Sequence, residues 1–133
     1  MMTGLDTNML VRFFVMDDAH QAEKASSYIK GVITGGGSFF INLIVICELV
    51  WVLESAYSYR KLEIVGLLEK MLATRQFEIE SKDIVRHAVN DYKNGSADFE
   101  DYLIGRANHH RGCSRTITFD RELKSSGMFE ILR

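Results

Sequence analysis

Apolar and polar residues along this chain follow two periods in turn, one typical of strands and one typical of helices. Short apolar or alternating runs predict strands at roughly 2–6, 38–42, 76–80, 115–119 and 128–132. Between them, apolar residues recur at the spacing of one helix face. We therefore expect helices at 7–15, 18–33, 43–57, 61–75, 82–94 and 97–111. Strands that alternate with helices are typical of βαβ units, so the pattern predicts an α/β fold with a parallel sheet covered by helices.

Two of the expected helices carry recognisable end signals. Asn42 stands directly before the helix at 43–57 and has a side chain suited to an N-cap. Ser96 is placed to cap the helix at 97–111. That helix closes with basic residues before Gly112, which suits both the helix dipole and a glycine C-cap.

Length and composition indicate one ordinary globular domain spanning residues 1–133. The net charge of −2 gives no basic surface, which argues against a tight nucleic-acid binder more than against a nuclease that borrows charge from metal ions. Cys47 and Cys113 lack metal-ligand spacing, and we expect both to be small, reduced core residues of a cytoplasmic protein. No signal peptide is visible, and the longest apolar stretch, 43–53, is too short to span a bilayer, so we expect no membrane association.

Five carboxylates lie within or directly after the apolar segments: Asp6, Glu48, Asp98, Asp101 and Asp120. Two of them end predicted strands, and the others belong to helices that follow or precede strands. A charge in apolar surroundings is costly unless it is paired or binds a metal ion. Sites in parallel sheets form beyond the carboxyl ends of the strands, so these acids could meet at one edge. The pattern predicts a site for a hard divalent cation and phosphodiester chemistry.

Three of these acids also have a simple structural interpretation. Asp6, or Thr7, could simply cap the helix at 7–15, and Asp120 could cap the short turn that follows it. Asp98 stands at a helix start, where the dipole favours an acid. Asp101 lies deeper in the same helix, so we favour it as the stronger metal ligand.

Glu48 is the acid that is hardest to explain structurally. Its neighbours Ile44, Val45 and Trp51 are apolar, so we expect a helix face that is not plainly solvated. Pairing with Arg12 or another distant cation is the structural alternative, because an isolated buried carboxylate would take up a proton. In the functional interpretation, Thr7 or Asn8 orients a carboxylate or a water molecule.

In order along the chain, Leu5-Asp6-Thr7-Asn8, Cys47-Glu48-Leu49, the segment 97–104 and the segment 116–121 resemble the PIN-domain ribonucleases, and most nearly the VapC toxins of bacterial toxin–antitoxin pairs. The resemblance places the acids of the family at Asp6, Glu48, Asp101 and Asp120, with Asp98 as an additional upstream acid. Thr118 matches a hydroxyl often seen near the last acid. The chain departs from the family pattern at Gly4, Asn42 and Tyr102.

The resemblance implies a three-layer α/β/α fold around a central, mostly parallel sheet of about five strands. It also implies an endoribonuclease that requires Mg²⁺ or Mn²⁺, a homodimer, and a small cognate antitoxin protein whose tail blocks the acidic groove. RNA would be the substrate, with a metal-activated water as the attacking group and one acid helping to deprotonate it.

Three other functions remain open from the residues alone. A phosphatase-type phosphoryl-transfer enzyme could use Asp6 as nucleophile, but it needs a second acid two positions later, where Asn8 stands. A receiver-like regulatory module would leave Glu48 without a role. A catalytically inactive PIN-like interaction domain fits the fold, although the full set of acids argues against it.

Overall fold

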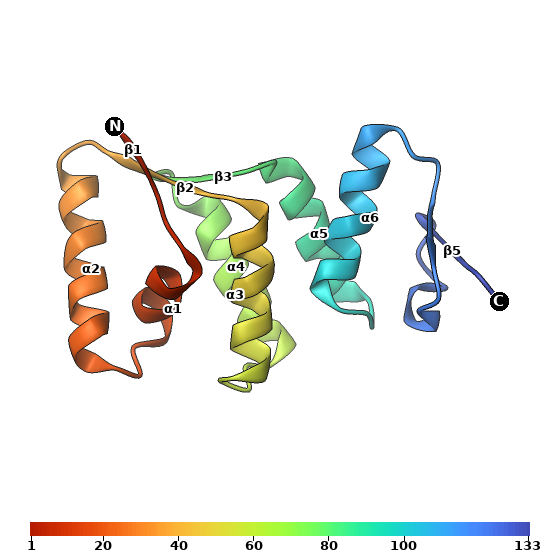
Figure 1. Cartoon of the computed structure of the whole chain (residues 1–133), viewed down its shortest axis with the longest axis horizontal. Helices are drawn as coiled ribbons and strands as arrows, with labels where there is room; N and C mark the ends of the chain where they lie inside the picture. The colour runs from red at the N-terminus through yellow and green to blue at the C-terminus, as the bar shows by residue number, and fades with distance from the viewer. The chain divides into compact units, whose positions relative to one another are not determined.

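The computed structural model describes the whole chain, residues 1–133, and Figure 1 shows the order of its helices and strands. The elements are β1 (Met2–Gly4), α1 (Thr7–Val15), α2 (Ala19–Thr34), β2 (Ser38–Ile41), α3 (Leu43–Ser55), α4 (Lys61–Ala73), β3 (Phe77–Ile79), α5 (Lys82–Asn94), α6 (Phe99–Arg111), β4 (Thr116–Thr118), the 3-10 turn η1 (Arg121–Leu123) and β5 (Phe129–Ile131). Every strand and helix expected from the sequence is present, within a few residues of its expected bounds.

The α/β fold class is confirmed, because helices alternate with strands and every strand pair is parallel. The five strands are divided between two sheets. One contains three strands in the order β1-β2-β3, and the other pairs β4 with β5.

The chain divides into two compact units. The first contains Met1–Arg60 and Lys70–Glu80, and the second contains Lys61–Glu69 and Ser81–Arg133. Helix α4 therefore contributes residues to both units. The expectation of one domain over residues 1–133 stays a prediction.

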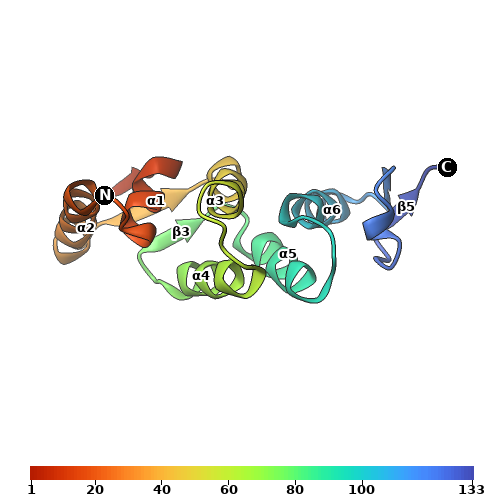
Figure 2. The ribbon, with the colours of Figure 1, turned by 90° about the horizontal axis from the view of Figure 1, so that it is seen from below.

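In the first unit, one face of the β1-β2-β3 sheet forms the core. Phe39 and Phe77 are register partners on adjacent strands, and both are buried. The ring of Phe13 on α1 meets Phe77 edge-on, and Tyr28 on α2 contacts Phe39. Helix α1 lies between α2 and α3 (Figure 2). These contacts fix the position of the β1–α1 turn, which carries Asp6.

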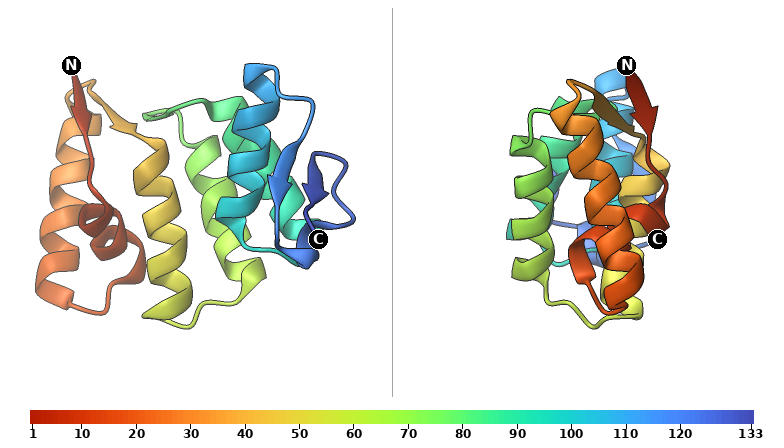
Figure 3. Two further views of the ribbon diagram at one scale, coloured as in Figure 1. Left: turned by 45° about the vertical axis from the view of Figure 1, so that its right-hand side comes forward. Right: turned by 90° about the vertical axis from the view of Figure 1, so that its left-hand side faces the viewer.

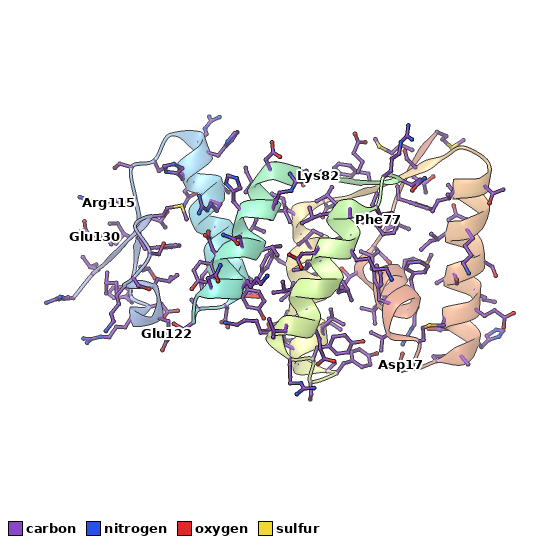
Figure 4. The ribbon with its side chains drawn as sticks, turned by 180° about the vertical axis from the view of Figure 1, so that it is seen from behind. Asp17, Phe77, Lys82, Arg115, Glu122 and Glu130 are labelled. Atoms are coloured by element: carbon purple, nitrogen blue, oxygen red, sulfur yellow. The ribbon has the colours of Figure 1, made fainter.

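In the second unit, α5 and α6 pack side by side (Figure 3), with the rings of Tyr92 and Phe99 in edge-to-face contact. Gly105 lets β5 approach α6 closely, because a Cβ at position 105 would lie 2.6 Å from the ring of Phe129. Arg115, directly before β4, and Glu130, within β5, form a 2.8 Å ion pair; both are labelled in Figure 4.

The helix ends agree with the sequence at two positions and differ at one. The Asn42 side chain accepts a hydrogen bond from the Val45 amide, which confirms the expected N-cap of α3. Gly112, with φ of 112°, ends α6 as expected. The expected cap at Ser96 is wrong, because α6 begins two residues later with Asp98 at the N-cap position. The Ser96 hydroxyl instead lies 3.5 Å from the Glu122 carbonyl oxygen.

The cysteine prediction is wrong for one of the two residues. Cys113 is exposed, because it directly follows the glycine that ends α6, and Cys47 is half-buried. Neither cysteine forms a disulfide bond. None of the helices combines the length and apolar character needed to cross a bilayer.

Candidate metal-binding carboxylates

Asp6 lies in the turn between β1 and α1 and caps the helix. Its Oδ1 atom accepts a 3.0 Å hydrogen bond from the Met9 amide. The carboxylate is exposed, and the cap occupies only one of its two oxygens. Capping and metal binding are therefore compatible, because the second oxygen is left for a cation.

Glu48 is exposed, contrary to the expectation from its apolar neighbours. Helix α3 buries the opposite side through Val45, Ile46, Leu49, Val50 and Leu53. Ile44 and Trp51, at helical spacing from Glu48, stay on its own side and are 72% and 63% exposed. The apolar residues next to Glu48 in the sequence therefore do not bury it.

Glu48 does not form the ion pair with Arg12 that the sequence left open as a structural alternative. Arg12 instead forms a 3.0 Å ion pair with Asp17, whose other oxygen accepts a 2.9 Å hydrogen bond from the Tyr57 hydroxyl. These bonds hold the pKa of Asp17 below its ordinary value, chiefly through the Tyr57 hydroxyl. Glu48 accepts a 2.8 Å hydrogen bond from the hydroxyl of Thr7.

Asn8 lies on the exposed side of α1, one residue after Thr7. It lines a groove of about 620 Å³ in the first unit. The groove is also lined by Asp6, Arg12, Lys24 and Tyr28. One of the predicted metal ligands, Asp6, is therefore part of its wall.

In the second unit, Asp98, Asp101 and Asp120 interact electrostatically. Asp98 occupies the N-cap position of α6, but its side chain makes no capping hydrogen bond and is exposed. Partial burial raises the pKa of the Asp101 carboxyl, and the negative charges of Asp120 and Asp98 raise it further. A carboxylate whose ionisation is disfavoured by neighbouring negative charges is stabilised in its charged form when a cation lies beside it.

Asp120 follows β4 and caps the short turn η1. Its Oδ1 accepts a 2.9 Å hydrogen bond from the Glu122 amide. Its own backbone N–H donates a 3.0 Å hydrogen bond to the Thr118 hydroxyl. Thr118 therefore fixes the backbone of Asp120 and does not contact its carboxylate.

Tyr102 is a positioning residue that the sequence did not reveal as one. Its buried hydroxyl accepts a 3.1 Å hydrogen bond from the Ala97 amide, one residue before Asp98. A Cβ at Gly95 would lie 1.9 Å from the same hydroxyl, so only glycine fits there. The tyrosine thus fixes the entry to α6. In the sequence, Tyr102 stands out only as a departure from the family pattern.

The donor chemistry of these residues fits a hard divalent cation, because every candidate ligand is a carboxylate oxygen. Within either unit, no three side chains of the types His, Cys, Asp and Glu lie close enough together to hold a metal ion. The structure joins Thr7 to Glu48 by a hydrogen bond in the first unit. In the second unit it places Asp98 and Asp120 near enough to Asp101 for their charges to raise its pKa, without forming a metal-holding group of three.

Comparison with known proteins identifies the family. Residues 4–126 match the PIN domain, and the chain therefore belongs to the PIN-domain family. It is also 27% identical over 123 residues to a VapC ribonuclease of Aquifex aeolicus (strain VF5), an alignment that covers 92% of this chain and 90% of that protein. The resemblance inferred from the acid-bearing motifs is confirmed, and it places the chain in a family of nucleases.

Proposed function

We propose that this protein is a metal-dependent endoribonuclease and the toxin of a toxin–antitoxin pair. The observation that carries the proposal is the placement of Asp101, whose pKa is raised by partial burial and by the negative charges of Asp120 and Asp98, because a cation beside these acids would relieve that unfavourable environment. Its support from the comparisons is the match to the PIN domain and the similarity to a VapC ribonuclease.

The proposed ligands of Mg²⁺ or Mn²⁺ are Asp6 and Glu48 in the first unit and Asp98, Asp101 and Asp120 in the second. A bound divalent ion of this kind lowers the pKa of a water molecule and stabilises negative charge on a phosphate. Thr7 holds one oxygen of Glu48 and leaves the other for binding. Asp101, the carboxyl with the raised pKa, is the one best suited to accept a proton from the attacking water.

The proposed partners are an RNA substrate, a small antitoxin protein and a second copy of the chain. A net charge of −2 makes the metal ion essential for bringing a polyanion to acidic residues, because like charges repel.

The test is cleavage of a circular single-stranded RNA by purified protein with Mn²⁺, Mg²⁺ or EDTA. We expect linear products only with metal, because only an endonuclease opens a circle. The Asp6→Asn variant, purified identically, controls for contaminating nucleases. A folded protein that leaves the circle intact with both metals would favour an inactive interaction domain. Hydrolysis of a phosphate monoester without RNA cleavage would favour the phosphatase alternative.

The toxin role has a separate test in cells. Induced expression of the wild-type protein should arrest growth, and expression of the folded Asp6→Asn variant should not. Equal growth of the two strains, at equal protein levels, would contradict the toxin assignment while leaving the nuclease assignment to the cleavage assay.

A further inference from the structure

Trp51 is an exposed aromatic side chain one helical turn from Glu48. It is 63% exposed, and it is the only tryptophan of the chain. No aromatic ring of the protein stacks on its indole, and the indole N–H has no partner within the protein. Tryptophan combines a large apolar ring with a polar N–H and is enriched at binding interfaces, so this exposed side chain is a candidate contact for a ligand.

The helix holds this side chain beside the candidate site. Glu48 and Trp51 are three positions apart on α3, and residues at that spacing have Cβ atoms about 5–6 Å apart on one helix face. The Ser55 hydroxyl bonds to the Trp51 carbonyl oxygen at 2.6 Å, so the backbone here is well held. The Thr7 hydroxyl holds the Glu48 carboxylate. The backbone of Trp51 and the carboxylate of Glu48 are therefore both held, and the indole lies within one helical turn of that carboxylate.

We propose that Trp51 stacks on a base of the RNA substrate, next to the phosphate that a metal ion held by Glu48 would bind. This inference rests on the proposed nuclease function. Aromatic side chains bind the bases of single-stranded nucleic acids without regard to sequence, because every base offers a π face. A nucleotide whose phosphate is held near Glu48 carries its base within reach of the indole. Ile44, one turn before Glu48 and 72% exposed, extends the same surface.

A second copy of the chain is the less favourable occupant of this surface. Glu48 lies at the centre of the exposed stripe, with Ile44 four positions before it and Trp51 three positions after it. A two-fold contact centred on this stripe is self-complementary and would set the two Glu48 carboxylates opposite each other. Like charges in a desolvated contact are unfavourable. A neutral base meets no such repulsion.

The first test uses the intrinsic fluorescence of the protein. Titration with a cleavage-resistant 2′-O-methyl oligoribonucleotide should quench the emission, because Trp51 is the only tryptophan. An oligonucleotide of the same length without bases keeps the phosphates and should leave the emission unchanged. Equal quenching by both probes, or by neither while the wild-type protein cleaves RNA, would overturn the proposal.

The second test separates stacking from catalysis. Trp51→Ala should raise KM for RNA by roughly 5- to 150-fold, the equivalent of about 1–3 kcal/mol for one stacked base, with kcat little changed. Trp51→Phe should recover much of the loss. Leu62→Ala is the matched control, because Leu62 is an exposed apolar residue (70%) on α4. An unchanged KM in Trp51→Ala would contradict the stacking role.

Light scattering on the same variants tests whether a second copy of the chain, and not RNA, occupies the surface around Trp51. The mass of Trp51→Ala in solution should equal that of the wild type, and a change of mass would assign the surface to subunit contact instead. The two proposals can also fail independently. Base-dependent quenching without any RNA cleavage would support stacking and contradict the nuclease assignment. RNA cleavage without quenching would support the nuclease assignment and contradict stacking by Trp51.

Discussion

The hydroxyl of Thr7 donates a 2.8 Å hydrogen bond to Glu48 across 41 positions of sequence. Thr7 opens α1 and Glu48 lies in the middle of α3, so the bond joins two helices that pack against each other. It restricts the rotation of an exposed carboxylate that has no cation partner. Orientation of a ligand by a neighbouring hydroxyl is how protein metal sites commonly keep their geometry.

Thr7→Val is expected to lower RNA cleavage by roughly 10- to 100-fold, the usual effect of losing a residue that orients a metal ligand. Valine has nearly the same shape but cannot donate a hydrogen bond, so the cost in the free energy of unfolding should be at most about 1 kcal/mol. Cleavage rates and urea denaturation measure the two effects. Thr7→Ser keeps the donor and should retain activity. Full activity in a folded Thr7→Val protein would show that the bond is only structural.

Asp6→Asn is expected to separate capping from catalysis. Asparagine caps helices as well as aspartate, so the bond to the Met9 amide and the melting temperature should be largely kept. The neutral amide is a poor ligand for a hard cation, and cleavage should fall by more than about tenfold. Circular dichroism, thermal melts and RNA cleavage provide the measurements. Asp6→Ala should lose about 1 kcal/mol of stability as well.

Asp101 makes the stability of the metal-free protein depend on pH. Its pKa is higher in the folded protein than in the unfolded chain, chiefly because of burial and then because of Asp120 and Asp98. A raised carboxyl pKa contributes stability that is fully present below the unfolded value and is lost as pH rises through the folded value. Asp101→Asn should therefore gain stability relative to the wild type between about pH 4 and neutral pH.

Urea denaturation in EDTA at several pH values tests this sign. The difference in unfolding free energy between Asp101→Asn and the wild type should grow with pH and then level off. A difference that is constant or shrinks over this range would mean that the charge of Asp101 is not disfavoured in the folded protein. Millimolar Mn²⁺ should reverse the advantage by stabilising the wild type through binding to the folded state.

Asp98 and Asp101 should respond differently to substitution and to metal. Asp98 makes no capping hydrogen bond, so Asp98→Asn should cost only the dipole contribution of about 0.3–1 kcal/mol. If Asp98 is also a ligand, high Mn²⁺ should restore part of the activity of this variant. Asp101→Asn should lose cleavage at every metal concentration. Metal-titrated cleavage of both variants provides the comparison, and the reverse ranking would exchange their roles.

The ion pair between Asp91 on α5 and Arg106 on α6 predicts a purely structural effect. Arg106 donates two hydrogen bonds to the carboxylate, at 2.6 and 2.8 Å, in a partly buried position. Arg106→Lys keeps the charge but loses the paired geometry and should cost about 1–2 kcal/mol, less than for a fully buried pair. Thermal melts should show the loss, and cleavage at a temperature where both proteins are folded should be unchanged.

The sequence alone determined the elements of this protein and the acids that they carry. Strand and helix bounds follow from the periodicity of neighbouring residues and from local caps such as Asn42, so they could be predicted without the fold. The acid-bearing motifs were sufficient to identify the PIN-domain family. The expected cap at Ser96 failed, because the start of α6 depends on a buried contact of Tyr102 and not on local propensity alone.

Only the tertiary structure decided the environment of each acid. Glu48 is exposed and accepts a hydrogen bond from Thr7, whereas Arg12 forms its ion pair with Asp17. Asp120 lies near enough to Asp101 for its charge to raise the pKa of the Asp101 carboxyl. The periodicity of a helix gives the angle between its own side chains, but the side that is buried depends on the elements that pack against it. Contacts between residues far apart in the chain depend on how whole helices and strands pack, which no local pattern encodes.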